Sequence, residues 1–226
     1  MIHITGDTHG YLWRLSSTVH FNGSDEWRKD DILIICGDFG FLNDGIEAAG
    51  DMICELEKFN YNICFCDGNH DNFPVIYSYP EEIWNGGRVH RIGKNIFHLM
   101  RGEIFEIENK KIFVMGGAYS IDKELKQEVN RWWSEELPTS EEYAHAIRSL
   151  DDANWCVDYI ITHTAPNEIT KNMVPRMFNN DAELTDFFNM IMHKAKFKKW
   201  FFGHWHRDEE INDQMRAIYC DVDTIE

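Results

Sequence analysis

The chain has 226 residues, 43% of them hydrophobic and 14% aromatic, which is enough to bury a sizeable core in one domain. Its formal net charge of −17, from 22 basic and 39 acidic residues, argues against non-specific binding to long nucleic acid or to anionic membranes. No run of about 18 apolar residues could cross a membrane, and the N-terminal segment lacks the basic and apolar regions of a signal peptide, so we expect a cytoplasmic protein.

The N-terminal third alternates between apolar strands and helical segments. Residues 1–6, 31–36 and 61–66 are predicted strands, and the continuous apolar run in the second is typical of a strand covered on both faces. Residues 11–20 and 45–60 are predicted helices, the latter because its apolar side chains recur at about the helical period. This order predicts an α/β fold with parallel neighbouring strands.

The next part of the chain is predicted to form an antiparallel meander and hence a second sheet region. Two candidate hairpin turns, Gly93-Lys94 and Asn109-Lys110, separate its short strands. The strands are expected at residues 88–92, 95–100, 103–108 and 111–115.

A glycine-rich loop, Gly116–Ser120, follows the meander. Its Tyr119 or Ser120 could line a pocket and touch a substrate. A simple turn that leads into the next segment explains the glycines equally well.

The charged residues 121–137 contain the tripeptide Arg131-Trp132-Trp133. They could form a lid in which Arg131 binds phosphate and a tryptophan stacks on a base or ring. A packed flap with an exposed arginine is the favoured alternative. We therefore expect one domain, residues 1–226, with a lid or flap insertion at about residues 117–138.

The C-terminal part again alternates between helices and strands. Thr139, followed by acidic residues in the first turn, is predicted to begin a helix that runs to about Asp151. Another helix is expected at residues 179–195, with Asp181 or a neighbour as its cap. Strands are expected at residues 155–161, 198–202 and 215–222.

The six cysteines contain no Cys-x-x-Cys pair. Four of them, Cys36, Cys64, Cys66 and Cys156, lie in apolar runs that are predicted strands. We interpret the cysteines as reduced core thiols rather than as a disulfide framework or a thiolate metal site.

Polar side chains follow five of the predicted strands directly. The five blocks are Gly6-Asp7-Thr8-His9-Gly10, Gly37-Asp38-Phe39-Gly40, Gly68-Asn69-His70-Asp71, Thr162-His163-Thr164 and Gly203-His204-Trp205-His206. In open α/β sheets, sites are built at the edge where such strands end. Oxygen and imidazole donors without a thiolate suit manganese, iron or zinc. Two divalent cations would also attract a phosphate ester that the net negative charge otherwise repels.

In this order, the five blocks resemble the calcineurin-like metallophosphoesterase superfamily. The resemblance implies a four-layer α/β/β/α sandwich of two mixed sheets flanked by helices, with the site at the strand ends. It also implies that Asp38 bridges two metal ions and that His70 contacts the phosphate and helps the leaving group depart. The remaining ligands fall into two groups, which are Asp7, His9 and His206 for one metal and Asn69, His163 and His204 for the other.

The activity that this resemblance implies is hydrolysis of a small phosphomonoester or phosphodiester, with a nucleotide-like substrate among the candidates. A hydroxide that bridges two divalent ions would attack phosphorus. We expect manganese, with iron or zinc as alternatives. The oligomeric state is left open.

The second block departs from the protein Ser/Thr phosphatase branch. That branch continues as Gly-Asp-x-x-Asp-Arg-Gly, whereas here Gly37-Asp38-Phe39-Gly40 continues as Phe41-Leu42-Asn43. The third block also ends in Asp71 where that branch has glutamate. We interpret Asp71 as an exposed turn carboxylate rather than one that orients a turn or a histidine. A phosphoprotein substrate is therefore disfavoured.

Two other functions stay open as alternatives. A non-catalytic scaffold of the same fold could bind a protein partner, although such proteins usually lose ligands that this chain keeps. A nuclease acting on long DNA or RNA is disfavoured by the net charge of −17 and the lack of a basic stripe.

Overall fold

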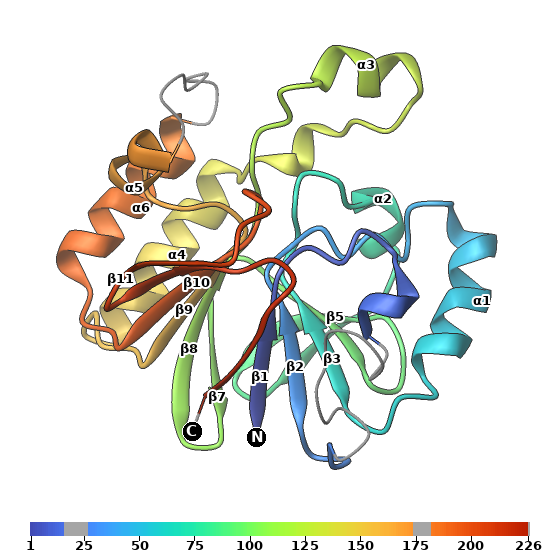
Figure 1. Ribbon diagram of the computed structural model, residues 1–226, viewed down its shortest axis with the longest axis horizontal. Coiled ribbons are helices and arrows are strands. Elements are labelled where there is room, and N and C mark those ends of the chain that lie inside the picture. The colour runs from blue at the N-terminus through green and yellow to red at the C-terminus, as the bar shows by residue number, and fades with distance from the viewer. Residues whose placement is uncertain (16–26, 174–181, 226) are drawn as a thin grey trace.

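Two β-sheets pack face to face in the computed structural model, which describes residues 1–15, 27–173 and 182–225. Helices lie against the outer faces of the two sheets (Figure 1). Within the described residues, the first sheet has seven strands in the order β13-β1-β2-β3-β6-β5-β4, and the second has six in the order β11-β12-β10-β9-β8-β7. The expected α/β sandwich of two mixed sheets is confirmed.

The first sheet has a parallel centre and antiparallel edges. Strands β1, β2, β3 and β6 are parallel neighbours, while β13, β5 and β4 pair antiparallel. Its strands are β1 (Ile2–Thr5), β2 (Ile32–Ile35), β3 (Asn62–Phe65), β4 (Glu81–Trp84), β5 (Gly87–Arg91), β6 (Ile96–Leu99) and β13 (Val222–Ile225).

The second sheet repeats this arrangement. Strands β8, β9, β10 and β12 are parallel, and the two edge strands pair antiparallel. Its strands are β7 (Glu103–Ile107), β8 (Lys110–Met115), β9 (Tyr159–Thr162), β10 (Lys199–Phe202), β11 (Glu209–Asn212) and β12 (Met215–Ala217).

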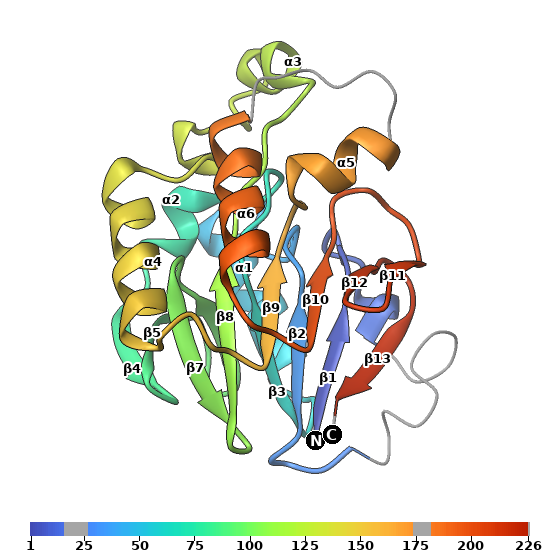
Figure 2. The same ribbon diagram turned by 90° about the vertical axis from the view of Figure 1, so that its left-hand side faces the viewer.

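The helices divide between the two outer faces and one end of the molecule. Figure 2 shows α4 and α6 in front of the second sheet, and Figure 1 shows α1 beside the first. Helix α3 lies at the end where β1 and β2 finish (Figure 1). The helices are η1 (Leu12–Leu15), α1 (Ile46–Leu56), α2 (Phe73–Ile76), α3 (Lys123–Glu128), η3 (Ser134–Glu136), α4 (Ser140–Asp152), α5 (Asn167–Met173) and α6 (Ala182–Lys194). None of the described helices is long and apolar enough to span a membrane.

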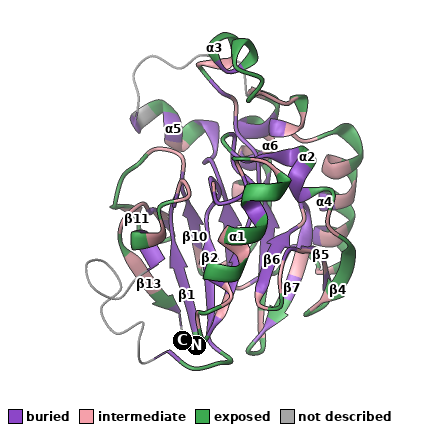
Figure 3. Ribbon diagram, turned by 90° about the vertical axis from the view of Figure 1, so that its right-hand side faces the viewer, coloured by how far each residue is buried: buried purple, intermediate pink, exposed green. Residues whose placement is uncertain are grey.

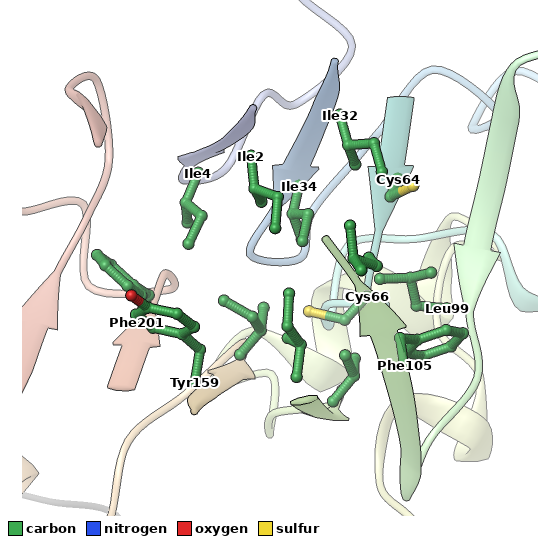
Figure 4. Packing of buried hydrophobic residues seen from close by; sticks show 14 of the residues in the cluster. Ile2, Ile4, Ile32, Ile34, Cys64, Cys66, Leu99, Phe105, Tyr159 and Phe201 are labelled. Carbon is green, nitrogen blue, oxygen red and sulfur yellow. The ribbon is translucent and has the colours of Figure 1, made fainter. Parts of the chain in front are cut away.

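Strand β2 illustrates why the central strands are apolar on both faces. Ile32 and Ile34 belong to the core between the sheets, whereas Leu33 and Ile35 pack in the cluster that includes residues of α1. Figure 4 shows Ile32 and Ile34 on one side of the central core, with Tyr159 of the second sheet on the other. Figure 3 shows the result, in which buried strands lie behind helices with exposed outer faces. Because both faces are covered, no polar residue interrupts the strand.

The prediction that residues 88–115 form one antiparallel meander is wrong, because their strands divide between the two sheets. Strands β5 and β6 join the first sheet, where β6 pairs with β3 in parallel, and β7 and β8 join the second. The chain crosses at Gly102, whose φ of +77° is one that glycine adopts readily. Similarly, residues 215–222 contribute to β12 and β13, which belong to different sheets, rather than to one last strand.

Several predicted boundaries also change. The second hairpin turn lies at Glu108-Asn109, which have φ of 49° and 59°, rather than at Asn109-Lys110. Only the 3-10 helix η1 is seen of the helix expected at 11–20, because residues 16–20 lie outside the described ranges, as does the expected cap Asp181. The predicted helix start at Thr139 is confirmed, and the structure adds a capping box between Thr139 and Glu142.

The prediction for the cysteines is correct for three of them. Cys36, Cys64 and Cys66 are buried, whereas Cys54 and Cys156 are exposed. Strand β9 begins only at Tyr159, and Cys156 forms only an isolated bridge with Lys196, so its side chain lies outside the core.

Candidate metal centre

The polar residues that follow five strands converge at one end of the sandwich. Asp7, Asp38 and Asn69 follow β1, β2 and β3 of the first sheet, and His163 and His204 follow β9 and β10 of the second. The two sets meet directly, because the backbone N–H of His204 donates to Asp7 Oδ1 at 3.0 Å. The site therefore lies where the carboxyl ends of parallel strands from both sheets face each other.

One group of donors consists of Asp7, His9 and His206, whose ligand atoms all lie within 4.8 Å of one another. His206 Nε2 is 3.1 Å from Asp7 Oδ2 and 3.0 Å from His9 Nε2. The hydrogen bond with Asp7 raises the pKa of His206, whereas burial lowers the pKa of His9. This corner thus gathers one carboxylate and two imidazoles around a small volume.

A second group lies on the other side of Asp38. His163 Nε2 is 3.1 Å from Asn69 Oδ1 and 3.5 Å from Asp38 Oδ1. The His204 ring stands edge-on to the His163 ring, with centroids 5.0 Å apart. Burial, followed by the neighbouring His163, lowers the pKa of His204 to about 3, so this imidazole is neutral at physiological pH, as a metal ligand must be.

Asp38 lies between the two groups. Its Oδ2 is 3.9 Å from His9 Nε2, and its Oδ1 is 3.5 Å from His163 Nε2. Burial opposes its negative charge, but the rings of His163, His70 and His9 outweigh that effect and lower the pKa of Asp38 to about 2. An ionised carboxylate at this position can reach toward both groups.

The hydrogen bonds of His163 are those expected of a histidine that binds a metal ion. Its Nδ1 donates to the carbonyl of Cys36 at 2.8 Å, which directs the lone pair of Nε2 toward Asn69 Oδ1 and Asp38 Oδ1. Metal-binding histidines commonly donate their other ring N–H in this way. Burial disfavours a charge on the ring, yet the Asp38 and Asp7 carboxylates prevail and raise the pKa of His163. Asn69 Oδ1, Asp38 Oδ1 and His163 Nε2 therefore face one another in surroundings that favour positive charge, which suits a divalent ion.

The backbone at the site adopts conformations that are rare for residues with side chains. His9, Asp38, His204 and His206 have positive φ angles of 48°, 50°, 66° and 50°. Such residues persist only where the surrounding structure holds them, and they concentrate at functional sites. At Gly68, a Cβ atom would overlap the Asp38 carboxylate, so glycine permits the close approach of these two loops.

His70 lies at the solvent side of the centre. Its backbone N–H donates to Asp38 Oδ1 at 2.8 Å, and its ring stands edge-on to that of His9 with centroids 5.4 Å apart. Burial is the main cause that lowers the pKa of His70, and Lys126 acts in the same direction. The structure thus places the proposed catalytic histidine beside the donor groups without making it part of either.

The prediction that Asp71 is an exposed turn carboxylate is wrong. Its side chain is buried and accepts backbone N–H groups from Gly68 at 2.8 Å, Gly40 at 2.9 Å and Phe39 at 3.3 Å. Burial and the nearby Asp38 raise the pKa of Asp71 to about 7, although the Gly40 and Gly68 donors act against this shift. Asp71 therefore orients two site loops, the alternative role considered for it.

The three candidate substrate contacts have different surroundings. Tyr119 is half-buried, and the buried Ser120 hydroxyl accepts from Asn69 Nδ2 at 3.0 Å. Arg131 is exposed, and its Nη2 lies 3.3 Å from Asp44 Oδ1. A cavity of about 210 Å³ beside the metal centre is lined by Asn43, His70, Asp122, Lys126, Val129, Arg131 and Trp133.

Sequence reasoning missed Lys126. Its Nζ donates to Ser120 Oγ at 2.8 Å and to the Asn69 carbonyl at 3.1 Å. No local pattern distinguishes this lysine from its charged neighbours, because its partners are brought to it only by the fold.

Comparison with a family model identifies the class of protein. The family model for calcineurin-like phosphoesterases matches residues 1–208, a range that includes every predicted site residue. A phosphopantetheinyl hydrolase from Mycobacterium tuberculosis is similar in structure, with 16% sequence identity and a TM-score of 0.43 over 96% of this chain and 87% of that chain. No curated protein sequence matches the chain.

Proposed function

The chain belongs to the calcineurin-like phosphoesterase family, and we propose that it is a dinuclear metal-dependent hydrolase of a small phosphoester. One observation carries the proposal, which is the position of Asp38 between two groups of donors. Its two carboxylate oxygens lie 3.9 Å from His9 Nε2 and 3.5 Å from His163 Nε2. A carboxylate in this position could bind one divalent ion through each of its oxygens.

Each of the two groups would hold one ion. Asp7, His9 and His206 would bind the first with one oxygen of Asp38, and Asn69, His163 and His204 the second with the other. When bound, the two cations would supply the Lewis acidity that activates water and neutralises charge on the phosphoryl oxygens. We expect manganese, because oxygen and imidazole donors suit it, with iron or zinc as alternatives.

His70 would act on the substrate rather than on the ions. Its main-chain hydrogen bond to Asp38 fixes the residue next to the centre, and its imidazole stands edge-on to the His9 ring without belonging to either donor group. From there the ring can donate a proton to the leaving oxygen or a hydrogen bond to a phosphoryl oxygen. Because burial lowers the pKa of His70, its protonated form is a stronger acid than an ordinary histidine.

The size and lining of the adjacent cavity favour a small anionic ester. Arg131 lines this cavity and is our main candidate for a direct substrate contact, and Trp133 offers an aromatic surface for a nucleotide-like leaving group. Tyr119 is not one of the lining residues and stays a second candidate from the sequence. Ser120 is buried with its hydroxyl engaged, so we place it outside the direct contacts. The absence of the Asp and Arg of the Ser/Thr phosphatase block continues to disfavour a phosphoprotein.

A panel of phosphoesters assayed with several metals tests the proposal. The metal-free protein, reloaded with Mn²⁺, Fe²⁺ or Zn²⁺, is assayed with bis(p-nitrophenyl) phosphate, p-nitrophenyl phosphate, and cyclic and linear nucleotides. Hydrolysis should require metal and should disappear in Asp38→Asn, while Asp51→Asn on the exposed side of α1 should match the wild type. A metal-loaded protein that cleaves none of these esters would contradict the proposal and favour the scaffold alternative.

A further inference from the structure

We propose that Lys126 is a positioning residue which, through Ser120, holds the Asn69 amide in the orientation that binds the second metal ion. The inference rests on the proposed function, since it concerns one of the two ions. It makes the segment of residues 117–138, which carries α3, a structural part of the metal centre.

The burial of Lys126 is the first observation. On α3, Lys126 is the buried residue, with 7% exposed, whereas Leu125 on the same helix and Val129 directly after it are 66% and 63% exposed. Lysine is among the residues least often buried, and burying its ammonium costs free energy unless partners compensate. A short helix that exposes its apolar residues and buries its lysine is therefore held in place by what the ammonium contacts.

Two hydrogen bonds and one ion pair hold the ammonium. Nζ lies 2.8 Å from Ser120 Oγ, 3.1 Å from the carbonyl oxygen of Asn69 and 3.5 Å from Asp122 Oδ1. Asp122 compensates part of the charge, and the other two partners belong to the surroundings of the metal centre. The ammonium thus fixes both the main chain of Asn69 and the hydroxyl of Ser120.

Ser120 transmits this constraint to the side chain of Asn69. Its Oγ accepts from Asn69 Nδ2 at 3.0 Å, which turns Oδ1 of the same amide toward His163 Nε2 at 3.1 Å. Only the oxygen of an asparagine amide can bind a cation, and a flipped amide would present its NH₂ group instead. If the Asn69 amide were free to flip, the affinity of the second metal site would therefore fall, while the affinity of the first would not change.

Measuring the binding of Mn²⁺ at each of the two sites separately distinguishes positioning of Asn69 by Lys126 from a general contribution of Lys126 to stability. Calorimetric titration gives the affinity of each equivalent, and electron paramagnetic resonance at two equivalents separates a spin-coupled pair from single ions. We expect Lys126→Met to bind the first equivalent as the wild type does and the second about 10–100-fold more weakly, the usual effect of removing a group that orients a ligand. The coupled spectrum should give way to that of single ions, and Ser120→Ala should do the same.

Lys123→Met is the matched control, because Lys123 lies on the same helix with its ammonium 3.9 Å from the centroid of the Trp132 ring. Lys123→Met should bind both equivalents of Mn²⁺ with the affinities of the wild type. The inference would be overturned if Lys126→Met bound both Mn²⁺ equivalents with affinities within about twofold of wild type. It would also be overturned if both affinities fell equally and the metal-free protein melted at a lower temperature. A wild-type chain that takes up fewer than two ions would instead overturn the proposed function, and this inference with it.

Discussion

The carboxylate of Asp71 accepts the backbone N–H of Gly40 at 2.9 Å and so joins the loop after β3 to the loop after β2. The same side chain accepts N–H groups from Phe39 and Gly68. These loops carry Asp38, the proposed bridge, and Asn69, a proposed ligand of the second metal ion. The relative position of these two residues is thus held by a third side chain that is not among the proposed ligands.

Replacing Asp71 with alanine should destabilise the protein strongly. The change leaves three backbone N–H groups without their acceptor, two of them on the buried residues Phe39 and Gly68. We expect the free energy of unfolding to fall by about 2–4 kcal/mol, because unsatisfied buried donors are costly. Urea denaturation of the metal-free protein measures it, with Asp51→Ala on the exposed side of α1 as a control that should change by less than about 0.5 kcal/mol. Equal effects of the two substitutions would contradict this role.

The buried pair of Asp67 and Arg101 should make stability depend on acid pH. Arg101 Nε donates to Asp67 Oδ2 at 2.9 Å, and His98 Nε2 lies 3.1 Å from Oδ1. Burial opposes ionisation of this carboxyl group, but Arg101 and His98 prevail and hold the pKa of Asp67 far below its usual value. A lowered pKa in the folded state gives stabilisation that is complete above the unfolded pKa, about 4, and is lost progressively as the pH falls below it.

Asp67→Asn tests this dependence. At pH 7 it should lower the free energy of unfolding by about 3–5 kcal/mol. The reason is that it removes the buried partner of Arg101 and leaves only the more distant Glu142, at 3.5 Å, to balance its charge. Between pH 5 and pH 3, values chosen to bracket the unfolded pKa of about 4, the variant should lose less stability than the wild type. Urea unfolding at a series of pH values measures both effects, and parallel curves for the two proteins would show that Asp67 does not cause the acid sensitivity.

The sequence was sufficient for features that depend on local pattern. The continuous apolar runs at β2 and β3 predicted buried parallel strands, and glycine-flanked polar residues after them predicted where ligands would gather. Hairpin signals could not tell which sheet a strand joins, because the pairing of β6 with β3 depends on packing of distant segments. The burial of Asp71 and Lys126 was missed for the same reason, since their partners Gly40 and Asn69 are 31 and 57 residues away.

Removing the imidazole of His70 should affect chemistry more than binding. If the ring acts on the leaving group, His70→Ala should lower kcat by about 10²–10⁴-fold, the usual contribution of a general acid. The affinity for Mn²⁺ and the melting temperature should change little, because the ring belongs to neither donor group. Steady-state kinetics with calorimetry measures this, and His193→Ala, at an exposed histidine of α6, should resemble the wild type. A His70→Ala variant with undiminished kcat would remove this residue from the mechanism.

Substitution of Arg131 should separate substrate binding from catalysis. Its only contact with a charged partner among the described residues is the exposed pair with Asp44, so Arg131→Met should change stability by less than about 0.5 kcal/mol. Loss of a charged hydrogen bond to a phosphoester should raise KM by about 10-fold, with kcat nearly unchanged. Kinetics on the best ester of the panel measures this, and Arg148→Met, at an exposed position of α4, provides the comparison. An unchanged KM would place Arg131 outside the substrate site.

Anomalous diffraction from a crystal grown with Mn²⁺ would locate the proposed metal ions. We expect two manganese peaks on opposite sides of the Asp38 carboxylate. One should contact Asp7, His9 and His206, and the other Asn69, His163 and His204. A crystal with no peak at these residues, or with a single peak that Asp38 does not contact, would contradict the assignment.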